Sequence, residues 1–144
     1  MRKATQEDFD DIFAILLDVY EESIWKELGP YDYETASQYI HDVIDSNETY
    51  IGDGLISINI SQPYHKRPIA SVVWLAAPKK ARNIKTVNAM FRIIDNVCLA
   101  HNCLAVFFIP DTILSGAFQS SFSNMMQKRG YTVFSNMYWR SLNG

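Results

Sequence analysis

The sequence predicts an α+β fold, with a mixed β-sheet and about four helices. Residues 69–77 and 103–109 are apolar runs on either side of an amphipathic stretch. This pattern is typical of a β-α-β unit with buried, parallel strands. Residues 49–60 alternate between apolar and polar side chains, which favours antiparallel strands. Residues 6–23 and 33–46 carry apolar side chains at three- and four-residue spacing, which predicts two amphipathic helices.

The N-terminal part is predicted to form a short strand and these two helices. Residues 2–5 are a strand candidate, and Thr5 followed by Asp8 resembles a capping box, which marks the start of a helix. After an irregular segment rich in aromatic residues, the second helix covers 33–46. We expect the two helices to pack on the same side of the sheet, because the connection between them is short.

The middle of the chain is predicted to form three antiparallel strands. Asp53 and Gly54 are a tight-turn signal, and residues 61–68 form a second loop with a proline near each end. The strands flanking these connections cover residues 49–52, 55–60 and 69–77.

A basic segment follows the strand at 69–77. Pro78 ends the strand, and residues 79–85 carry four positive charges. The helix has its apolar stripe between Val87 and Cys98, and it leads to the parallel strand at 103–109. Anionic ligands of α/β folds bind where a strand ends and a helix begins. This segment is therefore the first place to expect a ligand.

The last part of the chain is predicted to form a fourth helix and two strands. The helix begins after Pro110 to Thr112 and ends at Arg129–Gly130, a C-terminal glycine signal. The strands cover 131–134 and 137–142. The predicted order is β-α-α-β-β-β-α-β-α-β-β, in a single domain over residues 1–144.

Composition and charge exclude some classes of function. The 144 residues carry a net charge of −3, which disfavours a general nucleic-acid binder. No apolar run approaches the ~20 residues of a membrane span, and the N-terminus lacks a secretory signal, so we expect a cytoplasmic protein. Cys98 and Cys103 lie in apolar stretches and are interpreted as core thiols, with a disulfide between them as the alternative.

The element order and both ends of the chain resemble the GNAT family of N-acetyltransferases. The opening Arg2-Lys-Ala-Thr-Gln-Glu-Asp-Phe-Asp-Asp-Ile12 and the closing Lys128-Arg-Gly-Tyr131 carry the resemblance, together with Tyr138-Trp-Arg140. The pattern extends over Arg2 to Leu142. It implies a GNAT-like acyl-CoA N-acyltransferase fold and acetyl transfer from acetyl-CoA to an amine.

The resemblance also implies where acetyl-CoA would bind. The family holds the pyrophosphate with an Arg/Gln-x-x-Gly-x-Gly/Ala loop at the start of the third helix. Here Asn83, Lys85 and Val87 occupy the glycine positions. Cations would then replace backbone groups as phosphate ligands, and a solvated basic loop is the alternative. The expected cofactor-binding residues are Lys79, Lys80, Arg82, Asn83 and Lys85, with Val73 and Leu75 on the preceding strand.

The sequence assigns no catalytic residue. The family's general-acid tyrosine on the fourth helix corresponds to Met126, which cannot donate a proton. The nearest acids, Glu48, Asp53 and Asp111, are more typical of turns and caps than of a general base.

The three histidines, His41, His65 and His101, show no metal-site or triad spacing. We therefore expect no metal.

Acidic and aromatic residues gather where this fold places its acceptor pocket. Carboxylates combined with aromatic faces suit a cation, although a partly buried helix end would look the same. The residues are Glu21, Glu22, Trp25, Glu27, Tyr31 and Tyr33.

Two classes of function follow. In the first, the protein is an N-acetyltransferase acting on a small-molecule or protein amine. In the second, it has lost catalysis and binds a protein partner or forms a homo-oligomer, as GNAT-like phage proteins and virion components with degenerate motifs do. An enzyme requires an open cleft between the strands at 69–77 and 103–109, which Trp74, Phe107 or Phe108 would close in a degenerate protein.

Overall fold

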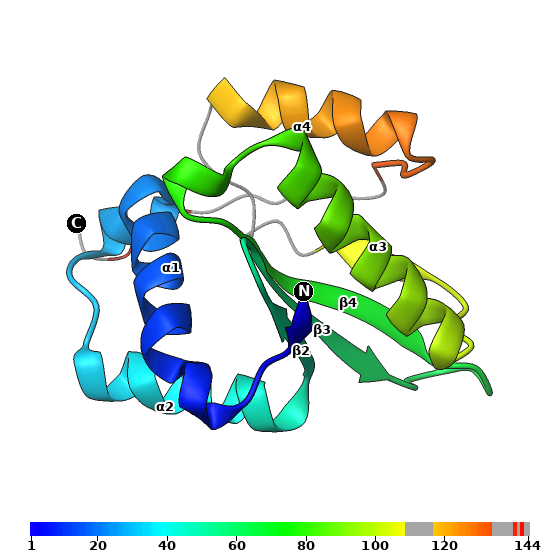
Figure 1. The fold of residues 1–144 in the computed structure, drawn as a ribbon, viewed down its shortest axis with the longest axis horizontal. Coiled ribbons are helices and arrows are strands. Elements are labelled where there is room, and N and C mark those ends of the chain that lie inside the picture. The colour runs from blue at the N-terminus through cyan, green and yellow to red at the C-terminus, as the bar shows by residue number, and fades with distance from the viewer. Residues whose placement is uncertain (109–116, 134–139, 141, 143–144) are drawn as a thin grey trace.

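The computed structural model describes residues 1–108, 117–133, 140 and 142, and Figure 1 shows the fold. Among these residues, five strands form one sheet in the order β1-β2-β3-β4-β5. The strands are β1 (Arg2–Lys3), β2 (Glu48–Ile51), β3 (Leu55–Ser61), β4 (Ile69–Ala76) and β5 (Val106–Phe108). The helices are α1 (Phe9–Glu22), α2 (Tyr33–Ser46), α3 (Ile84–Ala100) and α4 (Ala117–Lys128). Three short 3-10 turns complete the described part: η1 (Gln6–Asp8), η2 (Ile24–Leu28) and η3 (Lys79–Ala81).

The sheet has the mixed topology that the sequence predicts. Neighbouring strands from β1 to β4 pair antiparallel, and β4 pairs parallel with β5. The β2–β3 turn packs closely against α3, since a Cβ on Gly54 would lie 2.8 Å from the sulfur of Met90. A larger residue at this position would therefore require the side chains of Met90 and Thr86 on α3 to move.

The start of α1 is fixed by charge pairing. The guanidinium of Arg2 contacts the Asp8 carboxylate at 2.6 Å, and the same carboxylate accepts the N–H of Thr5 at 2.8 Å. These contacts lower the pKa of Asp8 from 3.8 to about 2. The Thr5–Asp8 signal in the sequence thus corresponds to a real helix start, although a 3-10 turn precedes α1.

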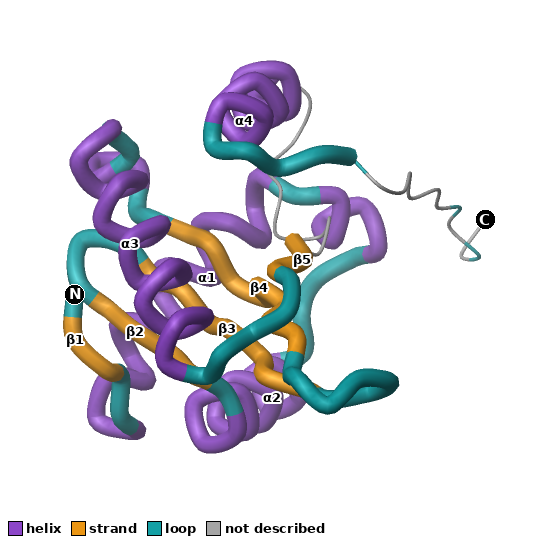
Figure 2. Tube along the Cα trace, turned by 90° about the vertical axis from the view of Figure 1, so that its right-hand side faces the viewer, coloured by secondary structure: helices purple, strands orange, loops and turns teal. Residues whose placement is uncertain are grey.

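The two faces of the sheet are covered by different helices (Figure 2). On one face, buried side chains of α1 and α2, such as Ile12 and Ile40, pack with Leu55 and Trp74 of the sheet. The other face packs against α3 and α4, and its centre includes Ile94. The prediction that the first two helices share one side is confirmed.

The C-terminal part differs most from the prediction. The parallel strand begins later than predicted, because residues 103–105 form no strand and β5 starts at Val106; its predicted end at Ile109 lies outside the described residues. Residues 131–133 were predicted as a strand but have no regular secondary structure, and Tyr131 packs edge-on against Phe108. The predicted start of the fourth helix and most of the final strand lie outside the described residues.

Both cysteines are free thiols and partly buried, as the sequence favours. Burial, together with the neighbouring Cys103, raises the pKa of Cys98 to about 12. No helix among the described residues is long and apolar enough to cross a membrane.

Candidate functional site

The centre of β4 contains a register shift that changes which way its side chains point. Trp74 pairs with Ser57 of β3 and Val72 pairs with the next residue of β3, Ile58, so Val73 is the extra residue of a β-bulge. Before the bulge, Val72 packs on the α3/α4 face. After it, Trp74 packs on the α1/α2 face, although both residues have even positions. The bulge therefore directs Val73 and Trp74 toward α1 and α2.

Among the described residues, the parallel pairing of β4 with β5 covers the first half of β4. The paired residues run from Ala70 opposite Val106 to Val72 opposite Phe108. Within the described part of the chain, the second half of β4 (residues 73–76) pairs with β3 alone. The bulge directly follows Val72, which forms the last described pair with β5, opposite Phe108.

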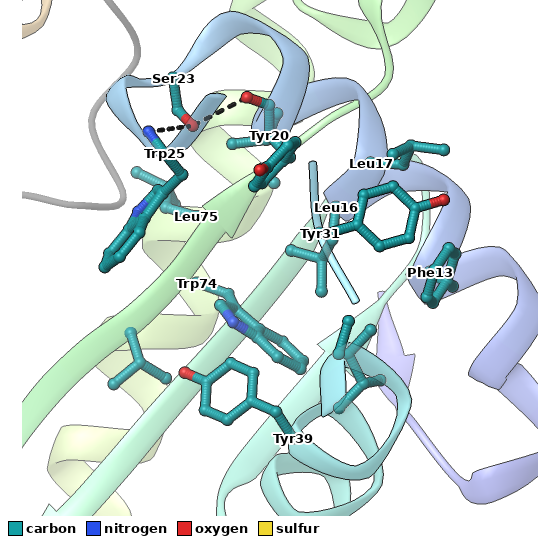
Figure 3. A pocket seen from close by; sticks show the side chains of 15 residues that line it. Phe13, Leu16, Leu17, Tyr20, Ser23, Trp25, Tyr31, Tyr39, Trp74 and Leu75 are labelled. Atoms are coloured by element: carbon teal, nitrogen blue, oxygen red, sulfur yellow. Dashed lines mark hydrogen bonds between the residues drawn. The ribbon is translucent and has the colours of Figure 1, made fainter. Parts of the chain in front are cut away.

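A pocket of about 520 Å³ lies over this second half of β4, between the strand and α1, η2 and α2. We call it the β4 pocket. Residues 73–76 form one wall, and Ala36 on α2 leaves space opposite them. Its volume falls in the usual range of small-molecule sites. The pocket is aromatic, and its rings come from Phe13, Tyr20, Trp25, Tyr31, Tyr39 and Trp74 (Figure 3).

The polar groups of the β4 pocket are few and largely engaged. The hydroxyl of Tyr20 donates to the carbonyl of Gly29, which ties α1 to the loop after η2. The hydroxyl of Ser23 donates to the carbonyl of Tyr20 and accepts the N–H of Trp25 (Figure 3). None of the described residues that line the pocket is charged. The arrangement can bind an apolar body but cannot supply a charged acid or base.

The basic segment after β4 joins the end of α1. Arg82 donates to the Glu22 carboxylate at 2.6 Å and to the carbonyl of Ala77 at 2.9 Å. Lys79 contacts the same carboxylate at 3.4 Å. Burial alone would raise the pKa of Glu22, but hydrogen bonds and charge from Arg82 and Lys79 outweigh it and lower that pKa. Both side chains of the Arg82–Glu22 pair are largely buried, so this pair positions the loop.

The remaining basic residues lie near the start of α3. Lys80 and Lys85 are exposed and form no ion pair with any residue that the structure describes. Asn83 caps α3 by accepting the N–H of Thr86 at 3.0 Å. A helix N-terminus with two unpaired lysines is an environment that favours an anion.

The structure thus separates the seven residues predicted to bind the cofactor into three groups. Val73 and Leu75 line the β4 pocket. Lys79 and Arg82 contact Glu22. Asn83 caps α3, while Lys80 and Lys85 are exposed to solvent.

The predicted acidic acceptor site takes a different form. Trp25 and Tyr31 line the β4 pocket, but Glu21, Glu22, Glu27 and Tyr33 do not. Glu21 contacts Lys26 at 3.5 Å. The pocket is therefore aromatic without being acidic.

The other candidates lie away from the β4 pocket. Glu48 contacts Lys3 and His101 at the start of β2, and Asp53 is exposed in a turn. His41 stacks on Phe9, while His65 is exposed. Asp111 lies outside the described residues.

Met126 is buried on the α3/α4 face. No cluster of His, Cys, Asp and Glu that could hold a metal occurs among the described residues.

Sequence reasoning missed the side chains of α1 and α2 that line the pocket. Phe13 and Tyr20 belong to the predicted apolar stripe of the first helix, and Tyr39 to that of the second. An apolar stripe looks the same whether it packs into a core or lines a cavity. The bulge at Val73 leaves no signal in a continuous apolar strand.

The three residues predicted as plugs of the cleft between the parallel strands take different positions. Trp74 is 6% exposed and forms part of the pocket wall, where its ring lies edge-on to Tyr39. Phe108 packs on the other face, against Phe91 and Phe122. Phe107 is partly buried in β5.

Comparison with solved structures identifies the fold. The chain is similar to a possible acetyltransferase from Clostridium difficile 630, with a TM-score of 0.73 and 13% identity over 99% of this chain and 97% of that one. A Trypanosoma brucei acetyltransferase has a TM-score of 0.71 and 13% identity, with coverage of 98% and 97%. The aminoglycoside N-acetyltransferase AAC(6')-Iy in complex with CoA has a TM-score of 0.66 and 9% identity, with coverage of 99% and 93%.

No protein-family model matches the sequence, and no curated protein matches it either. The structural similarity establishes that the chain has the GNAT acyl-CoA N-acyltransferase-like fold.

Proposed function

We propose that this chain, which has the GNAT fold, transfers an acetyl group from acetyl-CoA to an amine. The observation that carries the proposal is the bulged second half of β4, which among the described residues pairs with β3 alone and borders the β4 pocket. A thioester placed along this strand would lie beside a pocket able to hold the acceptor. Holding two reactants side by side supplies much of the rate of such a reaction.

The residues present fit the thioester end of acetyl-CoA. A bulge frees and redirects backbone groups of a strand, and N–H groups of residues 73–76 would polarise the thioester carbonyl. Val73 and Leu75 would contact the pantetheine arm. The lone pair of the amine nitrogen would attack the carbonyl carbon, the carbon–sulfur bond would break, and the nitrogen's proton would end on the CoA sulfur.

The phosphates of acetyl-CoA would be bound by lysine side chains, whereas the family binds them with the backbone of a glycine-rich loop. Arg82 and Lys79 already pair with Glu22, so they would position the loop. Lys80 and Lys85 lie beside the start of α3 and have no ion-pair partner within the described part of the chain, and they would pair with the phosphates. Such contacts between exposed charges weaken as salt increases.

Calorimetric titration with acetyl-CoA tests the proposal. We expect micromolar binding that becomes about tenfold weaker in a Lys80→Ala/Lys85→Ala double variant, a loss of about 1.4 kcal/mol. Lys66→Ala is the matched control, because Lys66 is an exposed lysine in the loop before β4, at the opposite end of that strand. The control should bind as the wild type does. No heat at millimolar acetyl-CoA would reject the proposal.

A second function is a binding protein that has lost catalysis, with a protein partner or a second copy of the chain. The observation that favours it is the absence of glycine from η3 and the start of α3, combined with the engagement of Arg82 by Glu22. In the same titration, this alternative predicts no heat from acetyl-CoA.

A further inference from the structure

The chemistry of the β4 pocket restricts the acceptor amine. None of its described lining residues is charged, and six of them are aromatic. An ammonium group in this pocket would find no carboxylate partner among these lining residues. Moving an unpaired ion into such a site costs several kcal/mol in real proteins, whereas a neutral amine avoids that cost.

Aromatic rings can attract a cation, but this attraction is smaller than the cost of taking an unpaired ion out of water. A cation–π contact requires a ring face within about 6 Å and contributes from about 0.5–1 kcal/mol at exposed sites to about 2 kcal/mol or more when desolvated. In the β4 pocket the rings meet each other edge to face. Tyr39 and Trp74 are inclined at 79°, as are Tyr20 and Tyr31, and Phe13 and Tyr31 are inclined at 68°. Each of these contacts covers one ring face with the edge of its neighbour, and no carboxylate among the described lining residues adds to the attraction.

From this geometry we infer that the acceptor is an amine on an aromatic body that is neutral near pH 7, such as an arylamine, and is not a polycationic amine. The inference rests on the proposed acetyl transfer. It also explains how transfer proceeds where the described pocket offers no carboxylate or histidine. A neutral amine already carries the lone pair that attacks the thioester, so no protein base has to remove a proton first.

The entrance of the pocket agrees with an aromatic ligand. Trp25 is 44% exposed and Tyr39 is 55% exposed, while Trp74 at the wall is 6% exposed. A ligand that enters would therefore replace water on the outer rings and contact a buried ring at the strand. Ala36, on α2, leaves room for this ligand.

Ligand-observed NMR with 4-methylaniline, benzylamine and spermidine, without acetyl-CoA, tests the pocket itself. We expect saturation transfer to 4-methylaniline, weaker transfer to benzylamine, and none to spermidine. An Ala36→Phe variant places a ring in the pocket and should weaken binding of 4-methylaniline about tenfold or more. Leu99→Ala, at an exposed residue of α3, is the control and should change nothing. Preferred binding of spermidine, or unchanged binding to Ala36→Phe, would overturn the inference.

Product formation then tests the acceptor role. With acetyl-CoA present, we expect wild-type protein to produce N-acetyl-4-methylaniline at a rate that changes little between about pH 6.5 and pH 8.5, because the amine stays neutral. The rate with benzylamine should rise with pH as its ammonium group loses a proton. Binding of acetyl-CoA and of 4-methylaniline without any product would overturn the acceptor role. A failure of acetyl-CoA to bind would reject the proposed function instead, and the NMR result would still decide the specificity of the pocket.

Discussion

The two faces of the sheet are lined by similarly apolar strands, but they serve different purposes. On the α3/α4 face, Ile58, Val72 and Ile94 have no exposed surface, and aromatic rings of α3, β5 and α4 pack on one another. The α1/α2 face is equally well packed around Ile12. Over the second half of β4, however, the same face contains the β4 pocket, with a volume of about 520 Å³. The same kind of side chain forms a core on one face and a binding site on the other.

The contrast arises from the bulge and from what lies opposite it. The bulge directs Val73 and Trp74 toward α1 and α2. Ala36 of α2 offers only a methyl group there, and η2 contributes the partly exposed Trp25. The apolar pattern of a strand therefore predicts that its side chains are buried. Whether they pack tightly or border a cavity depends on the backbone register, which the bulge changes in β4.

The largest effect is expected from a truncation on the packed face. Ile94→Ala removes a fully buried side chain at the centre of the α3/α4 face and should lower the free energy of unfolding by roughly 2–5 kcal/mol. Leu17→Ala enlarges the β4 pocket and should cost about 1 kcal/mol or less, because no tight packing is lost. Urea denaturation measures both values. If Ile94→Ala and Leu17→Ala lowered the free energy of unfolding equally, the proposed difference in packing between the two faces would be wrong.

An intermediate effect is expected where the two faces are joined. Arg82→Ala removes the charged hydrogen bonds to Glu22 and Ala77, and it should cost about 1.5–3 kcal/mol. Lys79→Ala is the matched control. Because Lys79 is exposed, this substitution should lower the free energy of unfolding by about 0.5 kcal/mol or less.

The same contact has a predictable pH dependence. Since the pKa of Glu22 is lowered below 4.5 in the folded protein, the contribution is complete above that value and disappears as pH falls through the folded pKa. A cost of Arg82→Ala that stays constant down to about pH 2 would contradict this role.

A smaller effect is expected at the start of α1, on the pocket side. Asp8→Asn removes the charge that pairs with Arg2 and should lower stability by about 1–2 kcal/mol at neutral pH. The carboxyl pKa falls from 3.8 to about 2 on folding. The difference from wild type should therefore be full above about pH 4 and shrink as pH decreases toward 2. Thermal unfolding across this pH range measures it, and a difference independent of pH would exclude the ion pair as its cause.

The order and direction of the elements up to β5 could be predicted from the sequence, because side-chain periodicity is a local property. The apolar runs around a helix predicted the parallel pair, and alternation predicted the antiparallel strands. The end of the chain was harder. Residues 131–133 have strand composition, but Tyr131 packs into aromatic rings next to α3 and α4 and forms no strand.

The site could be predicted only in part, for physical reasons. The basic segment was visible as charge, but its partner Glu22 lies 60 residues earlier in the chain. Charge alone therefore could not separate Arg82, which is engaged, from Lys80 and Lys85, which are exposed. The pocket was not visible because Phe13 and Tyr39 have the spacing of core residues. Only the folded backbone shows that they border a cavity.

Amide chemical-shift mapping of acetyl-CoA binding tests most directly the claim that the bulged end of β4 and its pocket form the site. The account predicts the largest shifts at residues 73–76 and at Lys80 and Lys85, with smaller shifts along the pocket walls. Amides of the central part of α3, around Ile94, should stay unchanged. Shifts concentrated on the α3/α4 face, or no shifts at saturating acetyl-CoA, would contradict it.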